Sequence, residues 1–453
     1  LSKEGIPVFL ADIKGDLSGL AKAGQWTPKL EERYKLLGLK DPFEPQAFPV
    51  RLWDVFGQAG HPVRATVEGM GSLLLSRLLD LNETQSGILA IVFKVAQEKD
   101  WPLIDLKDLQ SLLKEVYEHS SDYSAQYGNI TKQSVGAIQR SLLVLEEEGA
   151  DQFFGEPALD LNDFMQLDAS GRGYINILSA TKLFHSPKLY STFLIWMLSR
   201  LFETLPEVGD PEKPKLVFFF DEAHLLFKDA SKLFLEKVEQ VVRLIRSKGV
   251  GIYFITQNPQ DLPESVLAQL GNRVQHALRA YTPKEMKAIK VAAQSFRPNP
   301  DFDTETVITE LGTGEALVSF LNEKGQPSVV ERAYILSPQS SFDLLNESEQ
   351  LALITTSPFH QKYATTIDRE SAYEKLAAKA SKEAQEEEQK EAEKERAAAE
   401  KAEQKRSPGR PRKSSLEKAK DSFLSSLFRT IAREIAKLIM RSEEHTSELQ
   451  SHY

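Results

Sequence analysis

The sequence predicts an α/β fold, with a mostly parallel, doubly wound sheet, a helical insertion and a charged C-terminal tail. Continuous apolar runs end abruptly in polar residues, as expected for strands that are buried on both faces of a parallel sheet. These runs alternate with helical segments over residues 5–56 and 170–340, which is the signature of a doubly wound sheet. Residues 1–59 and 166–340 are therefore expected to form the two parts of one core.

The expected strands are short, apolar or β-branched, and lie between turn signals. In chain order they are Pro7–Asp12, Val50–Val55, Tyr174–Leu178, Leu216–Asp221, Gly251–Gln257, Val274–Ala280, Glu315–Leu321 and Ser328–Leu336. Two helices stand out between them, Lys188–Leu205 and Ala230–Lys248. The first has an apolar run that suits packing against a sheet, and the second should end at Gly249, because glycine readily adopts the left-handed conformation that terminates a helix.

Residues 60–165 are leucine-rich and are expected to form a helical insertion without buried strands. Within it, Thr131–Leu145 has two interpretations: the recognition helix of a helix-turn-helix, or a helix that packs one apolar face. Amphipathic helices usually bury a face for stability alone, which favours packing.

Beyond the core, residues 341–406 are expected to form a charged linker. Glu374–Arg406 is nearly all Ala, Glu, Lys and Gln, so it should be a solvated helix or disordered. A basic segment, 407–415, precedes an amphipathic helix over 416–441, for which docking on protein is favoured over binding to an anionic membrane. Residues 442–453 continue no pattern and are expected to be extraneous sequence.

Composition excludes several classes of protein. The absence of cysteine excludes disulfides and thiolate metal sites, and scattered histidines do not suggest a structural zinc site. No stretch approaches the ~20 apolar residues of a spanning helix, so a cytoplasmic protein without membrane contact is expected. The net charge of −10 argues against a surface coated in cations, but leaves room for nucleic acid in a local basic channel.

Two adjacent carboxylates, Asp221 and Glu222, follow the apolar run Lys215–Phe220. Ligands of open α/β sheets bind at the edge where parallel strands end. There Asp221 would hold a hydrated Mg²⁺, and Glu222 would orient or deprotonate a water that attacks a nucleotide phosphate. The alternative is that the pair caps the following helix, since carboxylates favour helix N-termini.

The next strand along the chain ends in Thr256, Gln257, Asn258 and Pro259. These polar residues would face the same crevice as the two acids, where Thr256 would bind the nucleotide cofactor and Gln257 would contact a γ-phosphate or the attacking water. The alternative is a turn, because Asn-Pro favours turns.

Two cationic residues are further candidates. Arg273 follows Gly271-Asn272 just before a strand and would reach the nucleotide of a neighbouring subunit, or form a surface salt bridge instead. Lys14 follows the first strand and would line the path of nucleotide or DNA, although Lys-Gly-Asp is also ordinary turn chemistry.

The sequence contains no Gly-x-x-x-x-Gly-Lys-[Ser/Thr] segment, the loop that cradles ATP phosphates. Gly312-Thr313-Gly314 precedes a strand instead of opening a helix, which indicates a turn. The chain starts at Leu1, almost directly in a strand, so an N-terminal piece with that loop is expected to be missing. We therefore predict that this chain alone neither binds nor hydrolyses ATP appreciably.

The chain resembles the HerA-like branch of the HerA/FtsK ATPases, which are RecA-fold DNA translocases. The stretches that carry the resemblance are Pro7–Leu17, Leu81–Val95, Gly128–Leu145, Gln152–Leu159, Leu216–Leu226 and Ile255–Asn272. The resemblance spans about residues 1–340 and departs from the family in lacking the phosphate loop, known as Walker A. That departure puts the activity of this chain, not of its parent protein, in question.

The resemblance implies particular roles. Asp221 and Glu222 match the Walker B pair, Gln257 the polar sensor beside Thr256, and Arg273 the arginine finger. It implies ATP and Mg²⁺ as cofactors, hexameric rings of identical subunits, and DNA as the partner, with a nuclease or another protein as a further partner. The expected function is an ATP-driven, helicase-like DNA motor. The alternative is a protein-remodelling or scaffold NTPase that does not act on DNA.

A second DNA contact is a candidate in the tail. Pro408–Lys413 resembles the core of an AT-hook, in which Arg410, Arg412 and Lys413 would lie in or near an A·T minor groove. A solvated basic linker is the favoured alternative.

Overall fold

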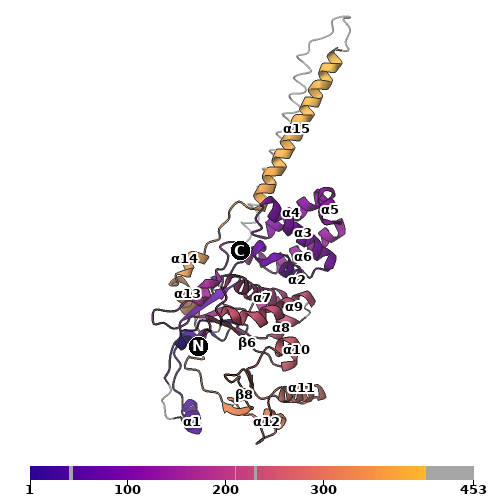
Figure 1. Cartoon of the computed structure of the whole chain (residues 1–453). Helices are drawn as coiled ribbons and strands as arrows, with labels where there is room; N and C mark the ends of the chain where they lie inside the picture. Colours follow the sequence, from indigo (N-terminus) through magenta and orange to yellow (C-terminus); the bar gives the residue numbers. More distant parts are fainter. Residues whose placement is uncertain (40–43, 210, 229–231, 405–453) are drawn as a thin grey trace. The chain divides into compact units, whose positions relative to one another are not determined.

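The computed structural model describes residues 1–39, 44–209, 211–228 and 232–404 of the chain (Figure 1). By its internal contacts the chain divides into two units, Leu1–Ala380 and Ser381–Tyr453. Of the second unit the structure describes residues 381–404, which continue helix α15 (Ala372–Gln404). The other elements belong to the first unit.

A six-stranded, all-parallel sheet forms the centre of the first unit, in the strand order β3-β2-β4-β1-β5-β6. Its strands are β1 (Val8–Asp12), β2 (Val50–Asp54), β3 (His61–Pro62), β4 (Ile175–Ser179), β5 (Leu216–Phe220) and β6 (Val250–Phe254). The predicted doubly wound α/β fold is confirmed, together with its parallel strands. The sequence did not predict β3, because two residues, one of them proline, give no periodic signal.

Helices α7 (Pro187–Thr204), α8 (His224–Phe227) and α9 (Lys232–Leu244) pack together beside this sheet (Figure 1). Helix α7 is buried almost continuously from Leu189 to Leu201, which explains its long apolar run. Helix α9 passes into the 3-10 helix η6 (Ile245–Lys248), and the predicted stop at Gly249 is confirmed by its left-handed φ of 77°.

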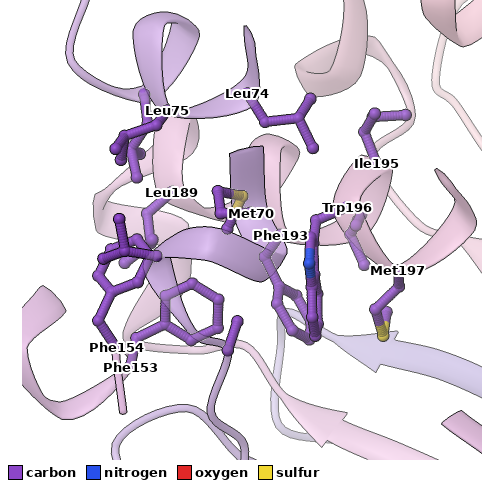
Figure 2. Close-up of a cluster of buried hydrophobic side chains, with 14 of the residues drawn as sticks. Met70, Leu74, Leu75, Phe153, Phe154, Leu189, Phe193, Ile195, Trp196 and Met197 are labelled. Atoms are coloured by element: carbon purple, nitrogen blue, oxygen red, sulfur yellow. The ribbon is translucent and has the colours of Figure 1, made fainter. Parts of the chain in front are cut away.

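The helical region consists of α2 (Val67–Leu78), α3 (Glu83–Lys99), α4 (Leu106–Glu118), α5 (Ser120–Tyr127) and α6 (Lys132–Glu147). Helix α2 packs on α7 through buried apolar side chains, including Met70, Leu74 and Phe193 (Figure 2). In the same contact, Nε1 of Trp196 donates a 2.9 Å hydrogen bond to the carbonyl oxygen of Gly69. These contacts fix the helical region to the sheet-bound helix.

Helix α6 contains most of Thr131–Leu145, the segment with two interpretations. Its buried residues are Val135, Ile138, Leu142 and Leu145, which lie at helical spacing on one face. The packing interpretation therefore accounts for that face.

A second sheet is separate from the first. Strands β7 (Arg273–Gln275), β8 (Glu315–Ser319) and β9 (Glu331–Tyr334) pair antiparallel in the order β7-β8-β9. These strands were predicted to belong to the doubly wound sheet, and the structure corrects this. The connection from β8 to β9 is too short for the crossover that parallel neighbours need. Helices α11 (Pro283–Gln294) and α12 (Thr304–Glu310) share an apolar cluster with this sheet.

The segment after β9 returns to the main sheet. Helix α13 (Glu347–Thr355) contacts β2, and helix α14 (Phe359–Tyr363) contacts β3. The remaining short elements are η1 (Ser2–Glu4), η2 (Ser18–Ala21), α1 (Pro28–Leu36), η3 (Ala150–Gln152), η4 (Leu161–Met165), η5 (Leu183–His185), η7 (Pro259–Asp261) and α10 (Glu264–Leu267). None of the described helices is long and apolar enough to cross a membrane.

Candidate active site at the carboxyl edge of the sheet

Strands β5 and β6 end side by side at the carboxyl edge of the main sheet. Phe220 pairs with Phe254 in register, and the hydrogen bonds continue beyond both strands. The amide of Ile255 donates to the carbonyl of Phe220 at 2.9 Å, and the amide of Ala223 donates to the carbonyl of Ile255 at 2.9 Å. Polar residues that follow the two strands are therefore held close together, as predicted for this edge.

Glu222 is the most constrained residue at this edge. The residue is 8% exposed, and its Oε1 accepts a 2.9 Å hydrogen bond from Nε2 of Gln257. Its φ of 48° lies in the left-handed region, which costs a non-glycine residue about 1–3 kcal/mol. The surrounding contacts must offset this strain, and they aim the carboxylate at Gln257.

The second oxygen of the same carboxylate has no hydrogen-bond partner among the described residues. Oε2 of Glu222 is buried and lies 3.3 Å from Nδ1 of His224, but the two atoms are not aligned for a hydrogen bond. A buried carboxylate oxygen without a partner is costly, so it is suited to accept a proton or a hydrogen bond from a bound molecule.

Asp221 is half-buried between Glu222 and β5. Its Oδ1 accepts a 2.9 Å hydrogen bond from the amide of Glu222, and its carbonyl accepts one from the Tyr190 hydroxyl at 3.1 Å. Burial raises the pKa of the Asp221 carboxyl; the nearby charge of Glu222 raises it further, while the hydrogen bond from the Glu222 amide and the charge of Lys14 lower it. Burial also raises the pKa of the Tyr190 phenol, so this hydroxyl remains a donor.

Lys14 reaches the same edge from the loop after β1. That loop folds onto the carboxylate of Asp12, which accepts hydrogen bonds from the amides of Gly15 at 2.7 Å and Leu17 at 3.0 Å. Continuing the pairing of Leu10 with Phe219 places Asp12 beside Asp221. The turn interpretation of this loop therefore holds, and it also brings an exposed ammonium group near the acid pair.

The hydroxyl of Thr256 is engaged inside its own turn. Oγ1 donates a 3.0 Å hydrogen bond to Oδ2 of Asp261, and the side chain of Asn258 caps the short helix η7. The turn interpretation thus applies to Thr256 and Asn258, while Gln257 between them points to Glu222.

Arg273 lies in the second sheet. Its Nη1 donates to the carbonyl of Ser295, the residue that caps helix α11, and burial lowers its pKa. Among the described contacts, none joins Arg273 to Asp221, Glu222 or Gln257 of the same copy.

Neither Tyr190 nor His224 was predicted from the sequence. His224 stands in the same run as the acid pair and had a local signal, whereas Tyr190 comes from helix α7 and had none. Arg410, Arg412 and Lys413 lie outside the described residues, as do residues 407–453.

The carboxylate side chains at this edge suit a magnesium ion that is bound together with a nucleotide. Within the described part of the chain, no group of three or more His, Cys, Asp or Glu residues is placed to hold a metal ion. Mg²⁺ commonly binds through one or two carboxylates and completes its shell with water and phosphate oxygens, so the single carboxylate of Asp221 fits such an ion without a further acidic ligand.

Comparison with known proteins gives the family. The model of the family "Helicase HerA-like C-terminal" matches residues 1–444. The chain is 25% identical over 211 residues to the DNA double-strand break repair helicase HerA of Saccharolobus solfataricus, covering 46% of this chain and 40% of that protein. It is 30% identical over 99 residues to the HerA helicase of Sulfolobus acidocaldarius, covering 22% of this chain and 19% of that protein.

Among solved structures, the plasmid coupling protein TrwB in complex with the non-hydrolysable ATP analogue ADPNP is 12% identical, with a TM-score of 0.46 over 76% of this chain and 89% of that chain. The match to the Saccharolobus relative spans only 40% of its length. The family model covers nearly all of the present sequence, and the chain belongs to the HerA-like helicase C-terminal family.

Proposed function

We propose that this chain is the catalytic part of an ATP-driven motor subunit that works in a ring and moves DNA. ATP is hydrolysed at the edge formed by Asp221, Glu222 and Gln257. The observation that supports this most is Glu222, whose buried carboxylate is held by Gln257 in a strained backbone conformation beside a second acid. A buried carboxylate on a strained backbone, at the carboxyl edge of a parallel sheet, suits general-base catalysis.

Each residue at the edge has a proposed role. Asp221 holds Mg²⁺ through water, and the bound ion would neutralise charge on the phosphates. Glu222 takes a proton from the attacking water at its free oxygen, Oε2, which is buried without a partner among the described residues. Gln257 positions Glu222 and senses the γ-phosphate, with Thr256 supporting its turn. Lys14 adds positive charge at the same edge.

The proposal concerns the full-length protein, by which we mean the product of the complete source gene. The present sequence has no Gly-x-x-x-x-Gly-Lys-[Ser/Thr] loop, so the phosphates need a cradle that these residues do not supply. The chain by itself is therefore expected to show no appreciable ATP turnover, and clear turnover by it would contradict this part of the proposal.

Arg273 is proposed to act on a neighbouring subunit. No described contact links it to the acid pair of its own copy, and its guanidinium is tied to a backbone carbonyl and not to a carboxylate. A guanidinium that exchanges this carbonyl for a phosphate would stabilise charge in the transition state, by about 10³–10⁵ in rate. This role requires a closed ring, for which we propose a hexamer in the cytoplasm.

The second candidate is an NTPase that remodels proteins and does not act on DNA. The net charge of −10 leaves this candidate open. The relatives named HerA are DNA double-strand break repair helicases, which favours DNA. A nuclease or another protein would then be a further partner.

Hydrolysis with and without DNA separates the two candidates. We expect DNA to stimulate ATP hydrolysis by the full-length protein, with DNA binding that weakens as salt rises. Turnover that is unchanged by DNA, together with no salt-sensitive DNA binding, would reject the DNA motor in favour of the remodelling NTPase.

A further inference from the structure

Positive charge is concentrated around helix α11, in an acidic protein. Between Ser265 and Arg297 the Lys and Arg residues are Arg273, Arg279, Lys284, Lys287, Lys290 and Arg297, and the only carboxylate is Glu285. The whole protein has a net charge of −10. This segment therefore carries a net positive charge, although the chain as a whole is negatively charged.

Two of the arginines have structural roles. Arg273 donates to the carbonyl of Ser295 at the end of α11, and Nη2 of Arg279 donates to the carbonyl of Leu311 at 2.9 Å, just beyond α12. Cations at helix C-termini satisfy carbonyls that lack a partner within the helix. These arginines hold the helices in place and leave the lysines to face solvent.

The one carboxylate is also occupied. Oε2 of Glu285 accepts hydrogen bonds from the amides of Tyr281 at 2.7 Å and Thr282 at 2.9 Å, and so completes the capping box of α11. It is thus committed to the helix N-terminus. None of the lysines of α11 has an ion-pair partner in the described ranges.

The three lysines share the outer side of the helix. Ile289 and Ala292 face the apolar cluster of the second sheet, whereas Lys284, Lys287 and Lys290 are exposed. Residues three apart lie on neighbouring positions of a helix surface, so the ammonium groups form one patch. We call Lys284, Lys287 and Lys290 the α11 basic face.

An aromatic ring stands at the start of this face. Tyr281 is 88% exposed and directly precedes Thr282, the residue that caps the helix. An exposed aromatic ring beside cations is the combination that binds single strands, because unpaired bases stack on the ring while cations contact phosphates. Duplex DNA keeps its bases stacked inside and gains little from such a ring.

The helix is also close to the candidate active site. Helix α11 contacts η7, the turn Pro259–Asp261, which begins two residues after Gln257. A polyanion on the α11 basic face would therefore sit on an element that packs against the turn that follows Gln257.

We propose that the α11 basic face binds the phosphate backbone of single-stranded nucleic acid, with a base stacked on Tyr281. The choice of nucleic acid over other polyanions rests on the proposed function. The assignment of this face as a binding surface rests on the exposed positions of the three lysines and of Tyr281.

Binding is measured on the 453-residue chain, without nucleotide, by fluorescence anisotropy of a labelled single strand of mixed sequence over a series of salt concentrations. The test variant changes Lys284, Lys287 and Lys290 to Ala. The matched control changes Lys29, Lys99 and Lys324 to Ala; these lysines are exposed and lie on three other segments. Both variants lose three positive charges, so a difference in their affinity for the single strand shows that the position of the lysines matters and not the total charge alone.

We expect the test variant to bind single strands roughly tenfold or more weakly at moderate salt, with the slope of log affinity against log salt reduced by about 1 for each lysine. Tyr281→Ala should weaken the single strand more than a duplex, with the slope unchanged. The control should bind like the parent chain.

Three results would overturn the proposal: equal weakening in test and control variants, a duplex affected as strongly as the single strand by Tyr281→Ala, or loss of binding to phosphatidylserine vesicles without any effect on DNA. Circular dichroism of each variant checks that the helix is retained. Because no ATP is present, a failure here leaves the hydrolysis site untouched. Conversely, a full-length protein without ATPase activity that still binds through this face would reject only the proposed function.

Discussion

Nε2 of Gln257 donates a 2.9 Å hydrogen bond to Oε1 of Glu222, and this bond joins the residues that follow β6 and β5. It fixes one oxygen of the carboxylate and leaves the other, Oε2, without a hydrogen-bond partner among the described residues. Gln257 thus acts on Glu222 directly. Any molecule that competes for the Gln257 amide would change the position of the proposed base.

Gln257→Ala should therefore lower kcat more than it changes KM for ATP in the full-length protein. A hydrogen bond to a charged group contributes about 1.5–3 kcal/mol, which corresponds to a fall of roughly ten- to a hundredfold. Gln260→Ala, at an exposed neighbouring position, is the matched control and should leave both constants near the parent values. An unchanged kcat in Gln257→Ala would show that the hydrogen bond has no part in hydrolysis.

Asp221→Asn should stabilise the chain at neutral pH. Burial raises the pKa of this carboxyl above its ordinary value of 3.8, so its ionised form is less favourable in the folded than in the unfolded protein. A raised pKa in the folded state contributes stability at low pH that is lost as the pH rises through that pKa. The Tm of the variant should exceed that of the parent by roughly 1–3 °C at pH 7, and the gain should vanish near pH 3.

Thermal unfolding of the variant and of the parent at pH 7 and near pH 3 checks this prediction. The nearby carboxylate of Asp261 is kept in both proteins, because it accepts the hydrogen bond that holds the neighbouring turn. A variant less stable than the parent at pH 7 would mean that the hydrogen bond from the Glu222 amide outweighs burial of the charge.

Arg273 and Glu222 should complement each other between subunits. In the full-length protein, Arg273→Ala and Glu222→Gln should each be nearly inactive alone. When they are mixed and allowed to reassemble, a Glu222→Gln subunit would offer an intact Arg273 to the intact site of an Arg273→Ala neighbour, and turnover should recover in part. Arg297→Ala, an exposed arginine after α11, is the control for charge loss. Co-assembled but inactive mixtures would exclude a role in trans.

The contact between α2 and α7 should dominate stability. Phe193 is 0% exposed in the cluster of Figure 2, so Phe193→Ala should lower the free energy of unfolding by about 3–5 kcal/mol. Leu143 is 56% exposed on α6, and Leu143→Ala should change it by no more than about 0.5 kcal/mol. Denaturant unfolding of both variants makes the comparison, and equal effects would contradict the assigned packing.

Much of the fold could be predicted because buried parallel strands leave a local signal. The run that becomes β5 is apolar until Asp221, so both the strand and the acid at its end were visible in the sequence. The separate sheet of β7, β8 and β9 was not, because apolar runs alone do not reveal which strands pair; only the short connection between β8 and β9 excludes a parallel crossover between them.

The site was predictable in its residue types but not in its contacts. The left-handed φ of Glu222 and the nearby ring of His224 depend on how several segments pack, and no spacing in the sequence encodes them. The same holds for Arg273, whose partner at Ser295 arrives only when α11 folds beside β7.

ATP turnover by the Glu222→Gln variant of the full-length protein is the most direct measurement. The side chain keeps its size and its hydrogen-bond acceptor for Gln257 but cannot take a proton, so turnover should fall by about 10²–10⁴ while ATP remains bound. Glu264→Gln, on the exposed start of α10, should hydrolyse ATP at the parent rate. Turnover by Glu222→Gln equal to that of the parent would contradict the assignment of this edge as the site of hydrolysis.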